Sequence, residues 1–465
     1  MGKLPSALMN GIIQWPGSYD ECVNITTHVD LQWSNRSTFE DIQGRYCRVG
    51  IPLANVTQQD VIVASDFSAG SLVIGLCVPD TCSESDVLNL IREGLSLIPI
   101  SSFPEASKVV CQDGTIEYTT GAIVVIVVLS LLGSVLFLGT AYDVIFIQSN
   151  FDSRDYISSK KNNLSVTDDM ADGGPNEEIH YKIPDEQTSL LGNKVPAETK
   201  YQPGYCGRIL LAFSVYTNAS KILNTKQSAG SIRALNGIRV MSMTWVLLGH
   251  SYSFGITITE NVLPYFMVQF KRWTFQALLN ATVSVDTFFT ISGLLLSYLV
   301  LKEMKQNNGK LNWFMFYFHR FWRLTPCYML VIMTYSTLFQ YWGSGPFWPE
   351  TGIDPNCRDY WWTNLLYINN FFDMTKMCMG WSWYLSNDMQ FYVISPLMFV
   401  PLYFSGLIGV AVSSVFLLAT FITSGVIASY YNLPPNIIGG GGEANGMLHF
   451  FDDYYVNRIV VLALT

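Results

Sequence analysis

Long apolar runs, separated by shorter polar segments, dominate the chain. The clearest run, residues 121–142 (GAIVVIVVLSLLGSVLFLGTAY), contains no charged residue. About 20 apolar residues suffice to cross a bilayer as a helix. Further candidate spans lie at 236–257, 281–301, 324–342, 383–404 and 405–430, and another begins near Tyr455. The pattern predicts a multi-pass α-helical membrane protein.

Two segments break this pattern and divide the chain. Residues 1–119 contain clustered cysteines, and residues 150–205 are rich in charged and small polar residues, which is typical of disorder. We therefore expect a small ectodomain at 1–119 and a membrane anchor at 120–142. A disordered cytosolic linker is expected at 143–206, and a multi-span membrane domain at 207–465. Residues 207–223 are expected to lie as an amphipathic helix at the membrane interface.

Composition narrows the class of protein. Charged residues make up 14% of the 465 residues and the formal net charge is -9. Soluble domains typically carry about 25% charged residues, so a cytosolic enzyme is disfavoured. An acidic chain without a basic block also argues against a nucleic-acid partner.

Cysteines and glycosylation sequons point to an oxidising compartment for the first segment. Five of the nine cysteines lie there, namely Cys22, Cys47, Cys77, Cys82 and Cys111, with sequons at Asn24, Asn35 and Asn55. This combination is typical of a disulfide-linked extracellular or lumenal domain. The odd number leaves one thiol without a partner in the segment, and the spacing leaves the pairing open. With no signal peptide at residues 1–20, we expect the chain to be incomplete at its N-terminus.

One helix start is visible inside this domain. In GLCVPDTCSESDVLNLI (75–91), Ser83 is followed three residues later by Asp86, the spacing of a helix cap. We expect a mainly helical ectodomain. The Cys77/Cys82 spacing could suggest zinc, but a disulfide fits this compartment better, and no metal is expected.

Basic residues set the orientation. The segment 143–235 carries ten Lys or Arg residues and the predicted loop 302–323 carries five. The positive-inside rule places both in the cytosol and residues 1–120 outside, in the plasma membrane or an endomembrane. Cys357 and Cys378 would then also lie outside, where they could form a disulfide.

Three ionisable residues in predicted spans are candidates for catalysis, because such residues are costly in a membrane. In LNGIRVMSMTWVLLGHSY (235–252), Arg239 and His250 are eleven residues apart, about 16 Å along one helix face. Arg239 could hold an anion while His250 acts as a general base; the alternative is a snorkelling arginine and a structural histidine. Asp286, in SVDTFFTISGLLLSYLVL (284–301), could orient His250 or simply cap its helix.

Two further sets of polar residues accompany them. In FHRFWRLTP (318–326), Arg320 and Arg323 could bind the phosphates of a nucleotide-like donor, or merely anchor the loop. In WSWYLSNDMQFYVISP (381–396), Asp388 and Gln390 interrupt an aromatic span. A carboxylate there needs a partner, and His250 or Arg239 is a possible one.

Short signals in the cytosolic segment are weaker. Glu186, Leu190 and Leu191 have the form of an acidic dileucine motif, which would recruit sorting adaptors. The sequons at Asn163 and Asn218 are expected to be unused, because they are cytosolic.

These motifs together resemble a known pair of domains. GLCVPDTC in a cysteine-rich ectodomain resembles the N-terminal domain of nose resistant to fluoxetine proteins, and the order LNGIRVMSMTWVLLGH, VDTFFTISGLLLSY, HRFWRLTP, WSWYLSNDMQFY resembles the acyltransferase 3 family. The resemblance implies transfer of an acyl group from cytosolic acyl-CoA to a hydroxyl of a membrane lipid or small hydrophobic acceptor. It implies His250 as base, Asp286 and Arg239 as helpers, and Arg320 and Arg323 as CoA ligands.

The chain also departs from that family. Acyltransferase 3 domains usually have about ten spans, and fewer are complete here, so we expect the C-terminus to be incomplete too. Two alternatives stay open: a lipid or xenobiotic transport or binding protein without catalysis, and a receptor-like anchor. Polar residues inside the spans disfavour the anchor.

Overall fold

The structure is a computed structural model, and it describes residues 14–33, 36–52, 71–96, 108–112, 117–148, 203–226, 232–255, 258–259, 261, 265, 268–348, 354–373 and 376–433. Several expectations lie outside these residues: the linker with its dileucine motif, the sequons at Asn35, Asn55 and Asn163, and the span beginning near Tyr455.

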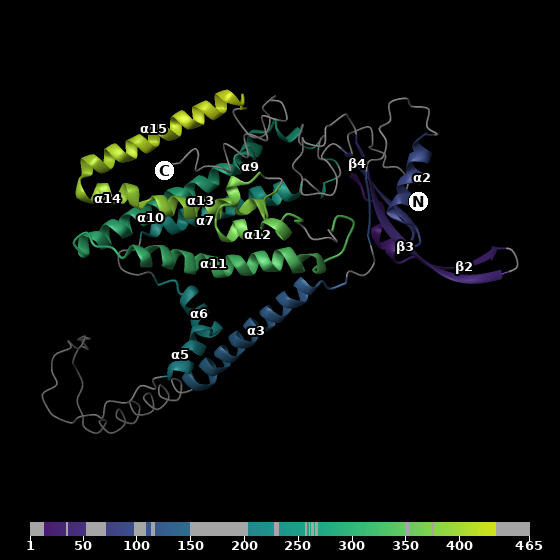
Figure 1. The fold of residues 1–465 in the computed structure, drawn as a ribbon, viewed down its shortest axis with the longest axis horizontal. Coiled ribbons are helices and arrows are strands. Elements are labelled where there is room, and N and C mark those ends of the chain that lie inside the picture. Colours follow the sequence, from purple (N-terminus) through teal and green to yellow (C-terminus); the bar gives the residue numbers. More distant parts are fainter. Residues whose placement is uncertain are drawn as a thin grey trace, which may run out of the picture. The chain divides into compact units, whose positions relative to one another are not determined.

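The N-terminal domain is built on a five-stranded sheet, so the expectation of a mainly helical domain was wrong (Figure 1). The strands are β1 (Gln14–Trp15), β2 (Thr26–Trp33), β3 (Arg36–Pro52), β4 (Ser71–Pro79) and β5 (Lys108–Cys111). Strand β3 is central: its first half pairs with β2, and its second half lies between β4 and β5, all antiparallel. Only α1 (Tyr19–Val23) and α2 (Glu84–Ser96) are helical among the described residues of this domain.

Two disulfides close this sheet. Cys22 bonds to Cys77 and Cys47 to Cys111, which leaves Cys82 as the unpaired thiol. Cys77 is therefore not available for zinc. Cys47 and Cys111 also belong to the apolar core, in which buried Val49, Val87 and Val109 join the sheet to α2.

The helix start expected at Ser83 is confirmed. The Asp86 backbone N–H donates to Ser83 Oγ at 3.2 Å, and the Ser83 backbone N–H donates to the Asp86 carboxylate at 3.0 Å. This reciprocal arrangement satisfies N–H groups at the start of α2 that have no partner inside the helix. The Ser83 hydrogen bonds also lower the pKa of Asp86.

Within 123–231, the described residues form a compact unit that contains most of α3 (Thr120–Tyr142), the π-helical turn η2 (Asp143–Gln148), α5 (Tyr205–Ala212) and α6 (Val215–Ile222). The single interfacial helix expected at 207–223 is thus two helices. They separate at Ser214, which caps α6 by accepting from the Thr217 N–H. The Ser214 and Thr217 hydroxyls both donate to the fully buried carboxylate of Asp143, which ties α6 to the end of α3.

The remaining helices lie within residues 232–433, the region that the sequence predicts to be a multi-span membrane domain. The long ones are α7 (Arg233–Gly255), α10 (Ser284–Gln306), α11 (Trp313–Leu338) and α15 (Gly406–Tyr430). Shorter ones are α9 (Gln276–Leu279), α12 (Cys357–Leu365), α13 (Trp383–Ile394) and α14 (Pro396–Phe404), with 3₁₀ turns η4 (Trp273–Phe275), η5 (Ala281–Val283), η6 (Phe339–Tyr341), η7 (Asn369–Phe371) and η9 (Gly380–Ser382).

Within the described residues, three helices are long and apolar enough to cross a membrane: Thr120–Gln148, Ala281–Gln306 and Gly406–Tyr430. They match three of the expected spans. Two other expectations need correction. The predicted loop 302–323 is mostly helical, because α10 continues to Gln306 and α11 already begins at Trp313. The predicted span 383–404 is two helices, α13 and α14, which meet at Ser395.

Candidate functional site

Arg239 and His250 lie on one continuous helix, α7, as the sequence predicts. Both side chains are exposed. His250 Nδ1 lies 3.0 Å from the carbonyl oxygen of Val246, one turn earlier on the same helix. A carbonyl oxygen only accepts hydrogen bonds, so this contact assigns the proton of the neutral ring to Nδ1. The Nε2 lone pair is then left to accept a proton from a ligand.

The register of α7 against α10 determines the level of Asp286. The two helices run antiparallel: Thr287 Oγ1 donates to Ser242 Oγ at 2.5 Å, and a Cβ on Gly249 would lie 2.5 Å from that of Ala281. Asp286 precedes Thr287 and therefore lies at the level of residue 243 of α7. That position is four residues from Arg239 and seven from His250, so at about 1.5 Å per residue Asp286 is closer in level to Arg239. Its role beside His250 stays a prediction.

Arg320 and Arg323 lie in the first half of α11 and not in a loop. The short connection 307–312 turns sharply, with positive φ at Asn308 and Gly309, and Asn312 caps α11 by accepting from the Met315 N–H at 3.2 Å. Arg320 is partly buried, whereas Arg323 is exposed. The two arginines therefore have different surroundings although they are three residues apart.

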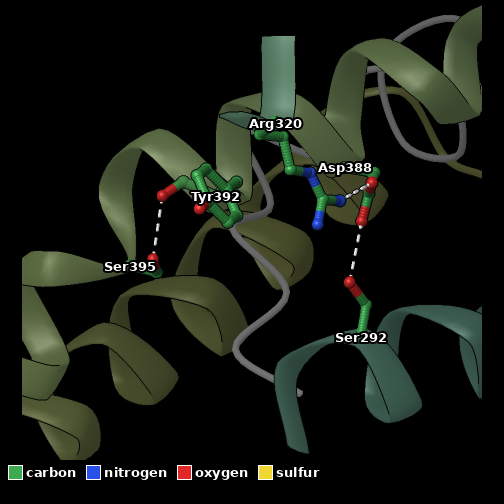
Figure 2. A network of polar contacts seen from close by, with 5 residues as sticks. All are labelled: Ser292, Arg320, Asp388, Tyr392 and Ser395. Carbon is green, nitrogen blue, oxygen red and sulfur yellow. Dashed lines mark hydrogen bonds and ion pairs between the residues drawn. The ribbon is translucent and has the colours of Figure 1, made fainter. Parts of the chain in front are cut away.

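The partner of Asp388 is Arg320, and not His250 or Arg239, the two possible partners that the sequence offered. Arg320 Nη2 donates to Asp388 Oδ2 in an ion pair between α11 and α13, with side-chain exposures of 22% and 13%. Figure 2 shows that the other carboxylate oxygen, Oδ1, accepts from Ser292 of α10 at 3.0 Å. The ring of Tyr392 lies 4.6 Å from the guanidinium carbon, within range of a cation–π interaction. Three helices thus meet at one charge pair.

Tyr384 connects this charge pair with Arg239. The side chain interacts electrostatically with Asp388, Arg320 and Arg239, and its ring packs 4.6 Å from that of Phe289. Arg239 and Arg320 therefore both lie within electrostatic range of Tyr384 on α13. Together with Asp388 and Ser292 they form a charged layer, which lies about 16 Å along α7 from His250.

Gln390 belongs to a separate, neutral network. Its amide exchanges two hydrogen bonds with Asn370 of η7, at 2.8 and 3.0 Å, and its nitrogen also donates to the Tyr367 carbonyl oxygen at 2.7 Å. Further buried amides and hydroxyls continue the network, and they are Asn364, Asn369, Asn387, Ser382 and Ser386. Gln390 is therefore a structural residue that ties η7 to α13.

Asp354 lies beside the disulfide of Cys357 and Cys378, which is confirmed. The three groups are close enough to suggest a metal site. Both sulfurs are in the disulfide, however, and the Asp354 carboxylate accepts from the N–H groups of Met379 and Asn356, at 2.7 and 3.1 Å. The cluster instead fixes the turn at Met379, which has a positive φ of 49°.

A row of aromatic rings extends from His250. Phe254 lies 5.8 Å from the imidazole, Trp381 lies 5.5 Å from Phe254, and Tyr335 lies 5.2 Å from Trp381. Phe254 and Trp381 are exposed by 52% and 39%. An apolar, aromatic surface therefore adjoins the candidate base.

Two domain models match this chain, one over its N-terminal region and one over the helical region that begins at residue 232. Residues 232–457 match the Acyltransferase domain of the acyltransferase 3 type, and residues 1–91 match the N-terminal domain of the nose resistant-to-fluoxetine protein. The chain therefore contains a region similar to a membrane acyltransferase domain and, before it, a region similar to the N-terminal domain of nose resistant to fluoxetine proteins. Two disulfides link the N-terminal region.

Two proteins of Caenorhabditis elegans are similar to it. Nose resistant to fluoxetine protein 6 is 27% identical over 94% of this chain and 53% of its own length, and Regulator of hypoxia-inducible factor 1 is 27% identical over 38% of this chain and 36% of its own. The chain thus spans about half the length of the first relative. No solved structure matches it.

Proposed function

We propose that this chain contains the acyl-transfer site of an integral membrane enzyme, which moves an acyl group from cytosolic acyl-CoA to a hydroxyl of a lipid or other hydrophobic acceptor. The acyltransferase domain supports membrane acyl transfer at the level of the family. The choice of donor and acceptor is our inference from the charged layer and the adjoining aromatic row.

The contact of His250 Nδ1 with the Val246 carbonyl oxygen, at 3.0 Å, is the observation that carries this proposal. Because Val246 holds the Nδ1 proton, the unprotonated Nε2 is available as a general base. Nε2 would take the acceptor's hydroxyl proton while the oxygen attacks the thioester carbonyl. The C–S bond then breaks, and the thiolate leaves and takes up the proton as free CoA.

The exposed arginines supply the donor side of the site. Arg323 on α11 and Arg239 on α7 are exposed, and their guanidinium groups would bind the phosphates of the donor. Arg239 lies about 16 Å from His250 along α7, a separation that would keep a charged end of the donor apart from its reactive end.

The topology that fits this reaction is multi-pass, with the disulfide-linked domain outside. Lys302, Lys305 and Lys310 flank the short connection from α10 to α11, which the positive-inside rule assigns to the cytosol. The disulfides of the N-terminal domain and of Cys357 with Cys378 then lie on the opposite, oxidising side.

The test is acyl transfer from radiolabelled acyl-CoA to membrane lipids by the purified full-length protein, with wild type beside His250→Gln. Loss of a general base is expected to lower kcat by about a hundredfold or more, with binding of CoA retained. His319→Gln is the matched control, because His319 is an exposed histidine on α11. Equal transfer by wild type and His250→Gln would contradict the proposal.

The aromatic row also fits a second function, binding or transport of a lipid or xenobiotic without catalysis. In that case an apolar ligand would lie against Phe254 and Trp381, next to His250. Binding of a fluorescent fatty acid would then be lost in Trp381→Ala and unchanged in His250→Gln, while no acyl transfer would be detected for the wild type.

A further inference from the structure

Arg320 and Arg323 are both predicted from the sequence to bind phosphate, but only Arg320 forms an ion pair with Asp388 in the described part of the chain. Asp388 compensates the charge of Arg320, and Ser292 holds the second carboxylate oxygen in place. Arg323 makes no ion pair among the described residues and is exposed. An anion near Arg320 would therefore meet an electrically neutral pair, whereas an anion near Arg323 would meet a full positive charge.

The guanidinium of Arg320 nevertheless keeps a donor for a ligand. Nη2 donates to Asp388, and Nε is buried without an acceptor among the residues that the structure describes. Nη1 has no partner there either, and 22% of the side chain is exposed. Tyr392 covers one face of the group, so the plane of the guanidinium is fixed (Figure 2). A neutral oxygen acceptor, such as an amide carbonyl, suits an N–H in a charge-neutral pair better than a phosphate does.

We propose that Arg320 and Asp388 form a specificity-determining pair that binds a neutral amide carbonyl in the arm of the acyl donor, while Arg323 binds the donor's phosphates. Asp388 positions Arg320 and repels anions from it. This inference rests on the proposed acyl-CoA donor. Its distinctive consequence is that removing the charge of Asp388 creates a new anion site at Arg320.

Equilibrium binding of free CoA to the full-length protein tests this division. Losing an arginine–phosphate hydrogen bond in Arg323→Ala is expected to weaken binding about tenfold or more. Asp388→Asn is nearly isosteric and is expected to tighten CoA binding about threefold, because Arg320 then carries an uncompensated charge. The double variant Arg320→Gln with Asp388→Asn removes both charges and the guanidinium donor, so its affinity for CoA is expected to fall about threefold below wild type, because the amide carbonyl loses a hydrogen bond. Weaker binding by Asp388→Asn, or wild-type affinity in the double variant, would overturn the proposal.

A second measurement does not depend on CoA. In an Arg323→Ala background, inorganic pyrophosphate should raise the thermal midpoint of the Asp388→Asn protein and not that of its parent. The same response in both proteins would overturn the charge compensation at Arg320. If the wild type binds no CoA, the proposed acyl-CoA donor is wrong. If pyrophosphate still stabilises only the Asp388→Asn protein, the charge of Arg320 is nevertheless compensated by Asp388.

Discussion

Arg320 on α11 and Asp388 on α13 form a partly buried ion pair across 68 residues of sequence. Ser292 of α10 holds the same carboxylate. The pair joins three helices at the level of Arg239, and so it is both a structural contact and the centre of the candidate donor site.

Removing one member of this pair should destabilise the protein more than removing both. Asp388→Leu leaves Arg320 without its anion, and loss of one partner of a buried pair costs about 3 kcal/mol. The double variant Arg320→Met with Asp388→Leu should lose less, because no charge is left uncompensated. Denaturant unfolding in detergent measures both. Equal losses in the single and double variants would show that the two residues are not coupled.

The disulfide of Cys357 and Cys378 should stabilise the segment between α12 and η9. It closes a chain separation of 21 residues, and disulfides of this size contribute about 3 kcal/mol. Replacing both cysteines by alanine is expected to lower the unfolding midpoint, whereas Cys327→Ala, at an exposed and unpaired cysteine, should not. Peptide mapping without reduction should find Cys357 and Cys378 linked, and a different pairing would contradict this structure.

Gln390 should be needed for stability and not for CoA binding. Gln390→Leu removes the donor to Asn370 Oδ1 and to the Tyr367 carbonyl oxygen, and each unsatisfied buried group costs about 1–3 kcal/mol. Gln276→Leu removes an exposed amide on α9 and serves as control. An unchanged unfolding midpoint in Gln390→Leu would show that the amide network contributes little.

Asp86 should make the N-terminal end of α2 sensitive to acid. Hydrogen bonds from Ser83 lower its pKa in the folded protein, so the charged carboxylate stabilises the folded state. This contribution is fully present above the unfolded pKa of about 3.9 and is lost as the pH falls through the lower, folded value.

Amide hydrogen exchange of residues 84–96 measures the stability of α2. It should be followed from about pH 5 to about pH 2.5, where carboxylates titrate, and corrected for intrinsic exchange rates. Protection should decrease toward the lower pH in the wild type. Ser83→Ala should show less protection at pH 5 and a smaller dependence on pH. A pH dependence that is the same in both proteins would contradict the role of this cap.

The spans and caps were predictable because they depend on residues close together in sequence. The length of the apolar run 121–142 is enough to predict a spanning helix, and the spacing of Ser83 and Asp86 is enough to predict where a helix begins. The break at Ser395 was missed, since an unbroken apolar run does not distinguish one helix from two. The helical character of 313–323 was missed because its basic residues made it look like a loop.

The candidate site was predictable only as a set of residues. Arg239, His250, Arg320 and Asp388 stand out because charges are costly among apolar residues. Their partners were not predictable, since any of several cations could face Asp388 until the packing of α11 against α13 is known. The aromatic and amide residues around them, such as Tyr384 and Asn370, gave no comparable signal, because such residues are common in membrane helices.

The sequence by itself determined that this chain has helices long and apolar enough to cross a membrane, that its N-terminal domain is rich in cysteines, and which ionisable residues need an explanation. These properties follow from composition and local spacing. Only the tertiary structure decided that the N-terminal domain is a sheet, that Cys82 is the unpaired thiol, and that Asp388 pairs with Arg320. Strand pairing, disulfide connectivity and ion pairing all join residues far apart in the chain, and the packing of the whole domain selects among the possible partners.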